Sequence, residues 1–349
     1  MKYEPEIYTF NNGEPVKTVE EWKERRKEIY KLFSEEQYGY FPSDELKVSY
    51  EKTRSEDLKE TGGTWETVKV TFETKKGKYE FPVNLFLADS LKKTPVIVWI
   101  HYGKTEPENY DLPYFFEAGF SLAVFNYAEV SKDSDDFEFG IAGLFDRDKY
   151  GSGKIGLWAL AARKIVDYLV IHPAIDSKNI AVAGHSRLGK TALWAGATDE
   201  RFRFVIPNNS GCSGMHIDRL SAEEKEHIPV IMTKFPFWYC ENALKYQDAS
   251  LIPPFDQHQL VALVAPRYLL VGDASEDPWA DYVAEEHSLK ASSKAWEYYG
   301  ETGYSNEGFC KVGGMHEAGN VSFHIREGGH DMNRYDWDIY LAFMKKHLA

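Results

Sequence analysis

From residue 95 onward the chain carries short apolar segments separated by turn-forming and polar residues. Segments that are apolar throughout, rather than alternating, are typical of strands buried on both faces of a mostly parallel sheet. Longer stretches at 154–171 and 188–198 lie between them and predict helices. The segments that we interpret as buried strands are Val96–Ile100, Leu122–Tyr127, Ile180–Gly184, Phe204–Pro207, Tyr268–Gly272 and Val321–Ile325.

The first 94 residues follow different patterns. Residues 18–35 predict an amphipathic helix, with Thr18 at its N-cap and two glutamates in its first turn. Two alternating segments, Thr67–Thr74 and Tyr79–Ala88, flank a short Lys/Gly turn and therefore predict an antiparallel hairpin.

Alternating strands and helices predict an α/β fold, a doubly wound and mostly parallel sheet that the chain enters through the N-terminal antiparallel hairpin. Ligand chemistry is then expected at the carboxyl ends of the strands. Neither an internal repeat nor a linker divides the chain, so we expect one domain over 1–349, with 1–94 as its N-terminal helix and antiparallel strands. The long irregular segment 209–265 is expected to carry helices that cap the site.

The composition of the chain restricts the classes of molecule that it is expected to bind. The 349 residues are 43% hydrophobic, the balance of a globular protein with a large core, and 41 Lys+Arg against 55 Asp+Glu give a net charge of −14. Nucleic acids and anionic membranes require a basic face, so neither partner is expected. No apolar run reaches the roughly 18 residues of a membrane helix. The N-terminus has no apolar leader, which leaves a cytoplasmic protein or a secreted one with its leader removed. A monomer is expected.

The three cysteines, Cys212, Cys240 and Cys310, have no C-x-x-C spacing, and no His-x-x-x-His pair exists. We therefore expect neither a metal nor a cofactor. His216 and His227, in the capping segment, are interpreted as structural. The thiols allow one bridge with one free cysteine, or none.

The sharpest chemical signal is the turn AGHSRLGK at 183–190, between a predicted strand and a predicted helix. A serine on such a turn exposes its hydroxyl, so Ser186 is the candidate nucleophile. The amide of Arg187 is placed to stabilise an oxyanion. Leu188 stands where the pattern G-x-S-x-G has its second glycine, and the glycine follows one residue later. The alternative is an ordinary turn with a surface serine.

A nucleophilic serine needs a base. His330 follows the last predicted strand in a glycine-flanked loop, where α/β-hydrolase folds place their histidine. His324 lies inside that strand and is expected to pack there. His185 is adjacent to the serine, and a structural role is expected for it.

The orienting acid has two candidate positions. After the strand Phe204–Pro207 the chain offers only asparagines, Asn208 and Asn209, which cannot stabilise an imidazolium by charge. The loop after Tyr268–Gly272 is rich in carboxylates. We choose Asp277, which precedes a proline and a tryptophan, over Asp273, Glu276 and Asp281.

These motifs resemble the glucuronoyl esterases of carbohydrate esterase family 15, in particular the bacterial branch. The resemblance implies an α/β-hydrolase fold and covers residues roughly 150–345. The departure from G-x-S-x-G is itself a feature of that family. The segments that carry the resemblance are 176–190, 209–214, 256–259 with 265–267, 276–281, and 324–331 with 335–337.

The resemblance implies a serine esterase that hydrolyses the ester between the glucuronate of xylan and a lignin alcohol through an acyl-enzyme. It implies Ser186 as nucleophile, His330 as base and Arg187 at the oxyanion. Many members carry a glutamate acid where Asn209 stands. Some bacterial members use an aspartate two residues before the site tryptophan, as Asp277 precedes Trp279. The positions that the resemblance implies as substrate contacts are Lys190, Trp279, Glu226 and Gln257.

Two other functions fit the same residues. One is an acetyl esterase that acts on xylan or another carbohydrate. The other is a non-catalytic carbohydrate-binding homologue, against which the intact Ser186, Asp277 and His330 argue. In each case the expected partner is a carbohydrate of the glucuronoxylan type.

Overall fold

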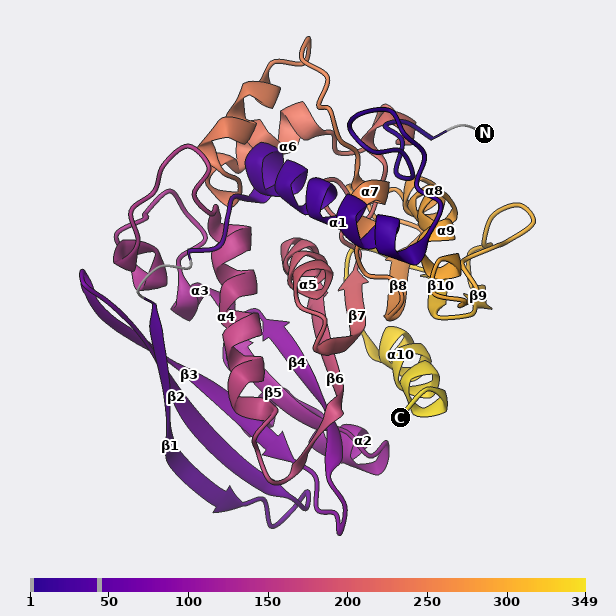
Figure 1. Cartoon of the computed structure of the whole chain (residues 1–349). Coiled ribbons are helices and arrows are strands. Elements are labelled where there is room, and N and C mark those ends of the chain that lie inside the picture. Colours follow the sequence, from indigo (N-terminus) through magenta and orange to yellow (C-terminus); the bar gives the residue numbers. More distant parts are fainter. Residues whose placement is uncertain (1–2, 43–45) are drawn as a thin grey trace.

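The computed structural model describes residues 3–42 and 46–349, and Figure 1 shows its course. Met1 and Lys2, the start of the terminus considered for a leader, lie outside these residues. The strands form a single sheet in the order β1-β2-β3-β5-β4-β6-β7-β8-β10-β9. Their bounds are β1 Lys47–Asp57, β2 Thr64–Thr74, β3 Gly77–Leu87, β4 Thr94–His101, β5 Ser121–Asn126, β6 Ile175–His185, β7 Phe202–Asn208, β8 Tyr268–Ala274, β9 Met315–Ala318 and β10 Val321–Arg326.

The centre of the sheet is parallel and its two edges are antiparallel. Strands β5, β4, β6, β7, β8 and β10 pair in parallel. At one edge β1, β2 and β3 form an antiparallel meander that joins β5, and at the other edge β9 pairs antiparallel with β10. This confirms the predicted doubly wound sheet that is entered through an antiparallel hairpin.

Helices cover both faces of the sheet (Figure 1). Consecutive residues of the buried strands point to opposite faces, so Val96 and Val98 join one hydrophobic core while Ile97 joins the other. The larger core includes α1, α4 and α5, and the smaller one packs beneath α10. The α-helices are α1 Val19–Phe33, α2 Leu112–Glu117, α3 Tyr127–Val130, α4 Lys154–Leu169, α5 Arg187–Thr198, α6 Ile228–Lys234, α7 Gln257–Ala262, α8 Tyr282–Ser292, α9 Lys294–Glu297 and α10 Arg334–Lys346.

Helix α1 begins as predicted, with Thr18 as N-cap in a capping box with Glu21. It continues into one π-helical turn, Ser34–Tyr38. The segment 209–265 carries α6, α7 and the 3₁₀ turns η4 Asp218–Leu220, η5 Pro236–Trp238 and η6 Glu241–Gln247. In the described part of the chain, no helix has the length and apolarity that crossing a membrane requires.

Candidate active site

Ser186 sits on a sharp turn between β6 and α5. Its backbone has φ 59° and ψ −127°, a strained conformation for a residue with a side chain. Two glycines allow the turn to close. A Cβ on Gly184 would lie 2.1 Å from the carbonyl oxygen of Leu188, and one on Gly189 would lie 2.7 Å from that of Asn208. The glycine one position later than in the usual pattern therefore lets α5 approach β7.

Asp277 and His330 come from different loops and meet beside this turn. Asp277 follows β8, and His330 follows β10, the parallel neighbour of β8. The Nδ1 of His330 lies 2.5 Å from Oδ2 of Asp277. This contact fixes the ring and leaves Nε2 for another partner.

Asp277 is itself held at both oxygens. Its Oδ1 accepts hydrogen bonds from the amides of Trp279 at 2.8 Å and Ala280 at 3.1 Å. Its Oδ2 also accepts a bond from the Nδ2 of Asn209 at 2.8 Å. Burial alone would raise the pKa of Asp277, but His330 and the two amides outweigh it and lower the pKa to about 2. The carboxylate is therefore ionised at neutral pH.

The other carboxylates of the loop are engaged elsewhere. Asp281 caps α8 by accepting from the amides of Val283 and Ala284. Asp273 lies fully buried against Glu285. The structure brings only Asp277, of the four acidic residues considered, within hydrogen-bond distance of His330 in the described chain.

The two neighbouring histidines have structural partners. His324 is fully buried in β10 and pairs with Asp336 at 2.8 Å. His185 lies 2.7 Å from the Oδ1 of Asn208, and its ring packs 4.4 Å from that of His330, centroid to centroid. Burial, with the nearby His330, lowers the pKa of His185 to about 4, so its ring is neutral.

Ser186 and His330 line one cavity of about 210 Å³. The predicted residues Arg187, Lys190, Glu226 and Trp279 line it as well. Further lining residues come from the capping segment, namely Asn209, Ser210, Gly211, Lys234, Phe235 and Trp238, and Ala280 comes from the loop after β8.

The main-chain and side-chain groups of Arg187 point to different partners. Helix α5 begins at Arg187, so its amide has no acceptor within the helix and can donate to an oxyanion. Its guanidinium is ion-paired with Asp133 and lies over the ring of Trp238 at 5.2 Å. Asp133 also accepts a hydrogen bond from the indole Nε1 of Trp238 at 2.6 Å. The guanidinium is thus held against one wall of the cavity.

Three of the predicted substrate contacts surround the same space. Lys190 is 4% exposed, and its ammonium donates to the carbonyl of Ser210 at 2.6 Å. Glu226 lines the cavity with it. Trp279 is 48% exposed and meets the ring of His330 edge-on, with centroids 4.8 Å apart. The cavity therefore offers an ammonium, a carboxylate and an open aromatic face.

Gln257, the fourth predicted contact, lies elsewhere. It is fully buried in the first turn of α7, and its Nε2 donates to Oε1 of Gln37 at 3.1 Å. It is not among the residues that line the cavity of Ser186. This side chain connects α7 to the turn after α1, so its placement at the substrate is corrected to a packing role.

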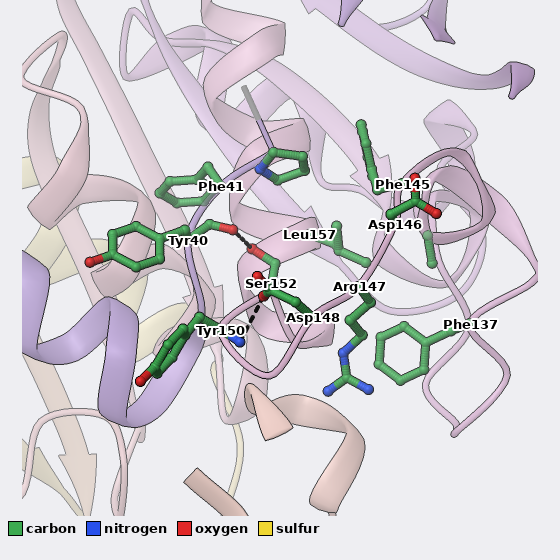
Figure 2. Close-up of a pocket in the computed structure, with 13 residues that line it drawn as sticks. Tyr40, Phe41, Phe137, Phe145, Asp146, Arg147, Asp148, Tyr150, Ser152 and Leu157 are labelled. Atoms are coloured by element: carbon green, nitrogen blue, oxygen red, sulfur yellow. Dashed lines mark hydrogen bonds between the residues drawn. The ribbon is translucent and has the colours of Figure 1, made fainter. Parts of the chain in front are cut away.

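A second and larger hollow, of about 370 Å³, lies between residues 40–42 and the loop 137–152 (Figure 2). Aromatic rings and Arg147 line it. Its serine, Ser152, donates to the carbonyl of Tyr40 at 2.8 Å. The residues that line this hollow include no histidine or cysteine.

Two site residues escaped the sequence analysis. Asp133 lies in the run Ser131–Asp136, where several acidic residues are equivalent by pattern. Trp238 lies in the aromatic stretch FPFWY at 235–239, whose density within a polar capping segment was an available signal. The three cysteines, whose pairing the sequence left open, are all free thiols.

Known proteins resemble this chain in sequence. The family model described as "Glucuronyl esterase, fungi" matches residues 68–300. Among curated proteins, the carbohydrate esterase MZ0003, from an unknown prokaryotic organism, is 28% identical over 99% of this chain and 89% of its own. A 4-O-methyl-glucuronoyl methylesterase of Phanerochaete carnosa is 26% identical over 88% of this chain and 75% of its own.

Solved structures match along the whole chain. A glucuronoyl esterase from Solibacter usitatus superposes with a TM-score of 0.90 at 29% identity, over 100% of this chain and 99% of its own. A glucuronoyl esterase of carbohydrate esterase family 15 from Teredinibacter turnerae gives 0.88 at 26% identity, over 99% and 89%. The sheet is therefore that of an α/β-hydrolase, and the chain belongs to the glucuronyl esterase family of carboxylic ester hydrolases.

Proposed function

We propose that this chain hydrolyses esters of 4-O-methyl-glucuronate, such as those joining xylan glucuronate to lignin alcohols, with Ser186, His330 and Asp277 as its catalytic triad. The observation that carries the proposal is the 2.5 Å contact between His330 and Asp277 at the cavity that also exposes Ser186. The family and its curated methylesterases support the ester class.

The reaction proceeds in two steps. His330 takes the proton of Ser186 as Oγ attacks the C6 carbonyl, and Asp277 stabilises the imidazolium. The amide of Arg187 donates to the developing oxyanion. The alcohol then leaves with the proton from His330. Water then attacks the glucuronoyl-serine while His330 takes its proton. His330 returns the proton to the Oγ of Ser186, and the free acid is released.

The walls of the cavity select a sugar acid. An esterified uronate is neutral, so its recognition depends on its hydroxyl groups and ring. Lys190 is placed to donate to hydroxyls, Glu226 to accept from them, and Trp279 to cover a pyranose face. Polar groups that a bound sugar encloses discriminate strongly, because an analogue without the matching hydroxyl leaves them unpaired.

A substrate panel tests the proposal. The purified chain is given benzyl glucuronate, benzyl galacturonate and acetylated xylan, and kcat/KM is measured for each. We expect glucuronate to exceed its C4 epimer by about tenfold or more, because one hydroxyl contact is lost. Activity on acetyl groups alone would contradict the uronate assignment and favour the acetyl esterase.

A variant separates catalysis from binding. Ser186→Ala should lose turnover by about 10⁴-fold or more while it still binds the sugar acid, because removing one triad member leaves only the oxyanion site and binding. Ser177→Ala, at an exposed position of β6, is the matched control. Unchanged turnover in Ser186→Ala would remove this nucleophile from the mechanism.

A further inference from the structure

Three residues of different chemistry converge behind the cavity. After β7 the chain turns through Cys212 and His216 and reaches Asp218 at the start of η4. One sulfur, one ring nitrogen and one carboxylate oxygen from these residues all lie within 4.8 Å of one another. The Sγ of Cys212 and the Oδ1 of Asp218 are 3.7 Å apart.

The imidazole of His216 has unused binding capacity in this cluster. Its side chain is fully buried, and neither ring nitrogen makes a hydrogen bond of normal geometry with the described residues, although the backbone of Glu226 lies near the ring. A buried imidazole is neutral, since burial disfavours the charged form, so one nitrogen carries a free lone pair. Buried polar groups are normally satisfied, and this lone pair therefore calls for a ligand.

The surrounding charges favour a cation. Three carboxylates, those of Asp218, Glu226 and Asp256, act on the thiol of Cys212. The ammonium of Lys190 opposes them, and the guanidinium of Arg219 is ion-paired with Asp256 at 3.1 Å. Cys212 is itself fully buried, and the side chain of Asp218 keeps 18% exposure, which gives an ion access from that side.

We propose that Cys212, His216 and Asp218 bind a Zn²⁺ ion. A thiolate, a neutral imidazole and a carboxylate form the mixed ligand set that zinc accepts, whereas calcium and magnesium prefer oxygen alone. Binding breaks the S–H bond of Cys212, forms a Zn–S bond and releases the proton to solvent. The proposal departs from the expectation of no metal, because the three ligands follow the spacing Cys-x-x-x-His-x-Asp rather than a C-x-x-C or His-x-x-x-His pair.

Neighbouring groups already orient the carboxylate. The Oδ1 of Asp218 accepts a hydrogen bond from the amide of Ile228 at 3.0 Å and lies 3.2 Å from Nδ1 of His227. Partners of this kind fix a ligand before metal enters. The ion would brace the loop 209–217, which forms one wall of the cavity, without touching the substrate.

Metal binding to the full-length chain tests the proposal directly. The chain is treated with a chelator, dialysed against Zn²⁺ and then freed of excess ion, and its metal content is measured. We expect one Zn²⁺ per chain. In a parallel sample Co²⁺ should give a sulfur-to-cobalt charge-transfer band, which reports a thiolate ligand. Neither readout depends on turnover, so failure here leaves the proposed esterase intact.

Variants assign the site. Cys212→Ser and His216→Ala should each lower zinc affinity by at least tenfold. Cys240→Ser is the matched control, since Cys240 is equally buried but its Sγ donates to the carbonyl of Glu35 and joins no such ligand group among the described residues. Cys310→Ser removes the more exposed thiol as a source of adventitious binding.

A wild-type chain that stays free of zinc and gives no sulfur band with Co²⁺ would overturn the proposal, even if the variants failed to fold. Equal zinc content in Cys212→Ser and wild type would overturn it as well.

Discussion

At the scale of single residues, Asp133 holds the long, charged side chain of Arg187 in one position. Its two oxygens bind different partners, the guanidinium of Arg187 and the indole of Trp238. Asp133 is 17% exposed at its side chain, so its charge is only partly screened by water. Asp133 thereby positions Arg187 and Trp238, two residues that line the cavity, without itself touching the reacting atoms.

Replacing Asp133 by asparagine should disturb both partners. The neutral amide cannot pair with Arg187 as a carboxylate does, and one wall of the cavity becomes mobile. We expect kcat/KM on benzyl glucuronate to fall about 10–100-fold, because small misplacements in an active site have effects of this size. Steady-state kinetics measures this fall in kcat/KM. The control is Asp135→Asn, at an exposed position of the same loop. Wild-type kinetics in Asp133→Asn would show that this contact does not position the site.

Local sequence identifies residues whose role depends on a turn. Ser186 and His330 stand beside glycines at the ends of predicted strands, and the topology alone brings such ends together. Asp133 depends instead on contacts with residues more than 50 positions away, which no local pattern records. Gln257 shows the reverse error, since its motif is informative but its side chain points into the core.

At the scale of elements, β8 and α8 meet through two buried carboxyl groups. Asp273 is the second-last residue of β8, Glu285 lies in the first turns of α8, and both are fully buried. Glu285 accepts a hydrogen bond from the amide of Gly211 at 2.7 Å. Burial and the neighbouring carboxylate raise the pKa of Glu285, and burial raises that of Asp273 to about 8. The pair therefore retains a proton at neutral pH.

This pair predicts a pH dependence of stability. A carboxyl group whose pKa is higher in the folded chain stabilises the fold fully below about pH 4, and the contribution is lost as pH rises towards 8. Asp273→Asn has no proton to lose. The melting temperature of Asp273→Asn, relative to wild type, should therefore rise between pH 5 and pH 8.

Exposed Asp89→Asn is the control for this comparison, and it should show no such trend. A constant difference between Asp273→Asn and wild type across that pH range would contradict the retention of a proton by this pair.

The sequence predicts the central strands and the hairpin of β2 and β3, but not the two edge strands β1 and β9. The parallel strands are buried on both faces and therefore appear as apolar runs. Strand β1 is largely exposed and rich in charged residues, and β9 has only four residues. Short or charged strands protect a sheet edge from pairing with other chains, and the same composition hides them from a search for apolar patterns.

At the scale of the whole molecule, the N-terminal helix ties distant parts of the chain together. Arg26 donates to the carbonyls of Leu263 and Ala265 at 2.8 Å each. Trp22 stacks on Tyr298, with ring centroids 5.8 Å apart. Contacts across more than 230 positions of sequence couple α1 to the C-terminal half.

We propose that the chain unfolds as one unit. Tryptophan fluorescence and far-ultraviolet circular dichroism should follow a single, coincident transition in denaturant, because α1 shares its core with α5 and α7. Separate midpoints for the two probes would show that the N-terminal segment and the sheet are independent units.

The order of the central strands and the position of the triad follow from general rules of α/β topology. The walls of the cavity do not, since Glu226, Lys234 and Trp238 belong to a capping segment with little regular structure. The residues that select the substrate are therefore brought together by tertiary contacts that the local sequence does not reveal.

The central claim is that Ser186 is a nucleophile activated by His330. The most direct measurement is covalent labelling with a fluorophosphonate, in which the serine oxygen bonds to phosphorus and fluoride leaves, followed by peptide mapping. We expect one label, on Ser186, and we expect it to be lost in the variant His330→Ala. Labelling of another residue, or no label on a chain that still turns over benzyl glucuronate, would contradict the account.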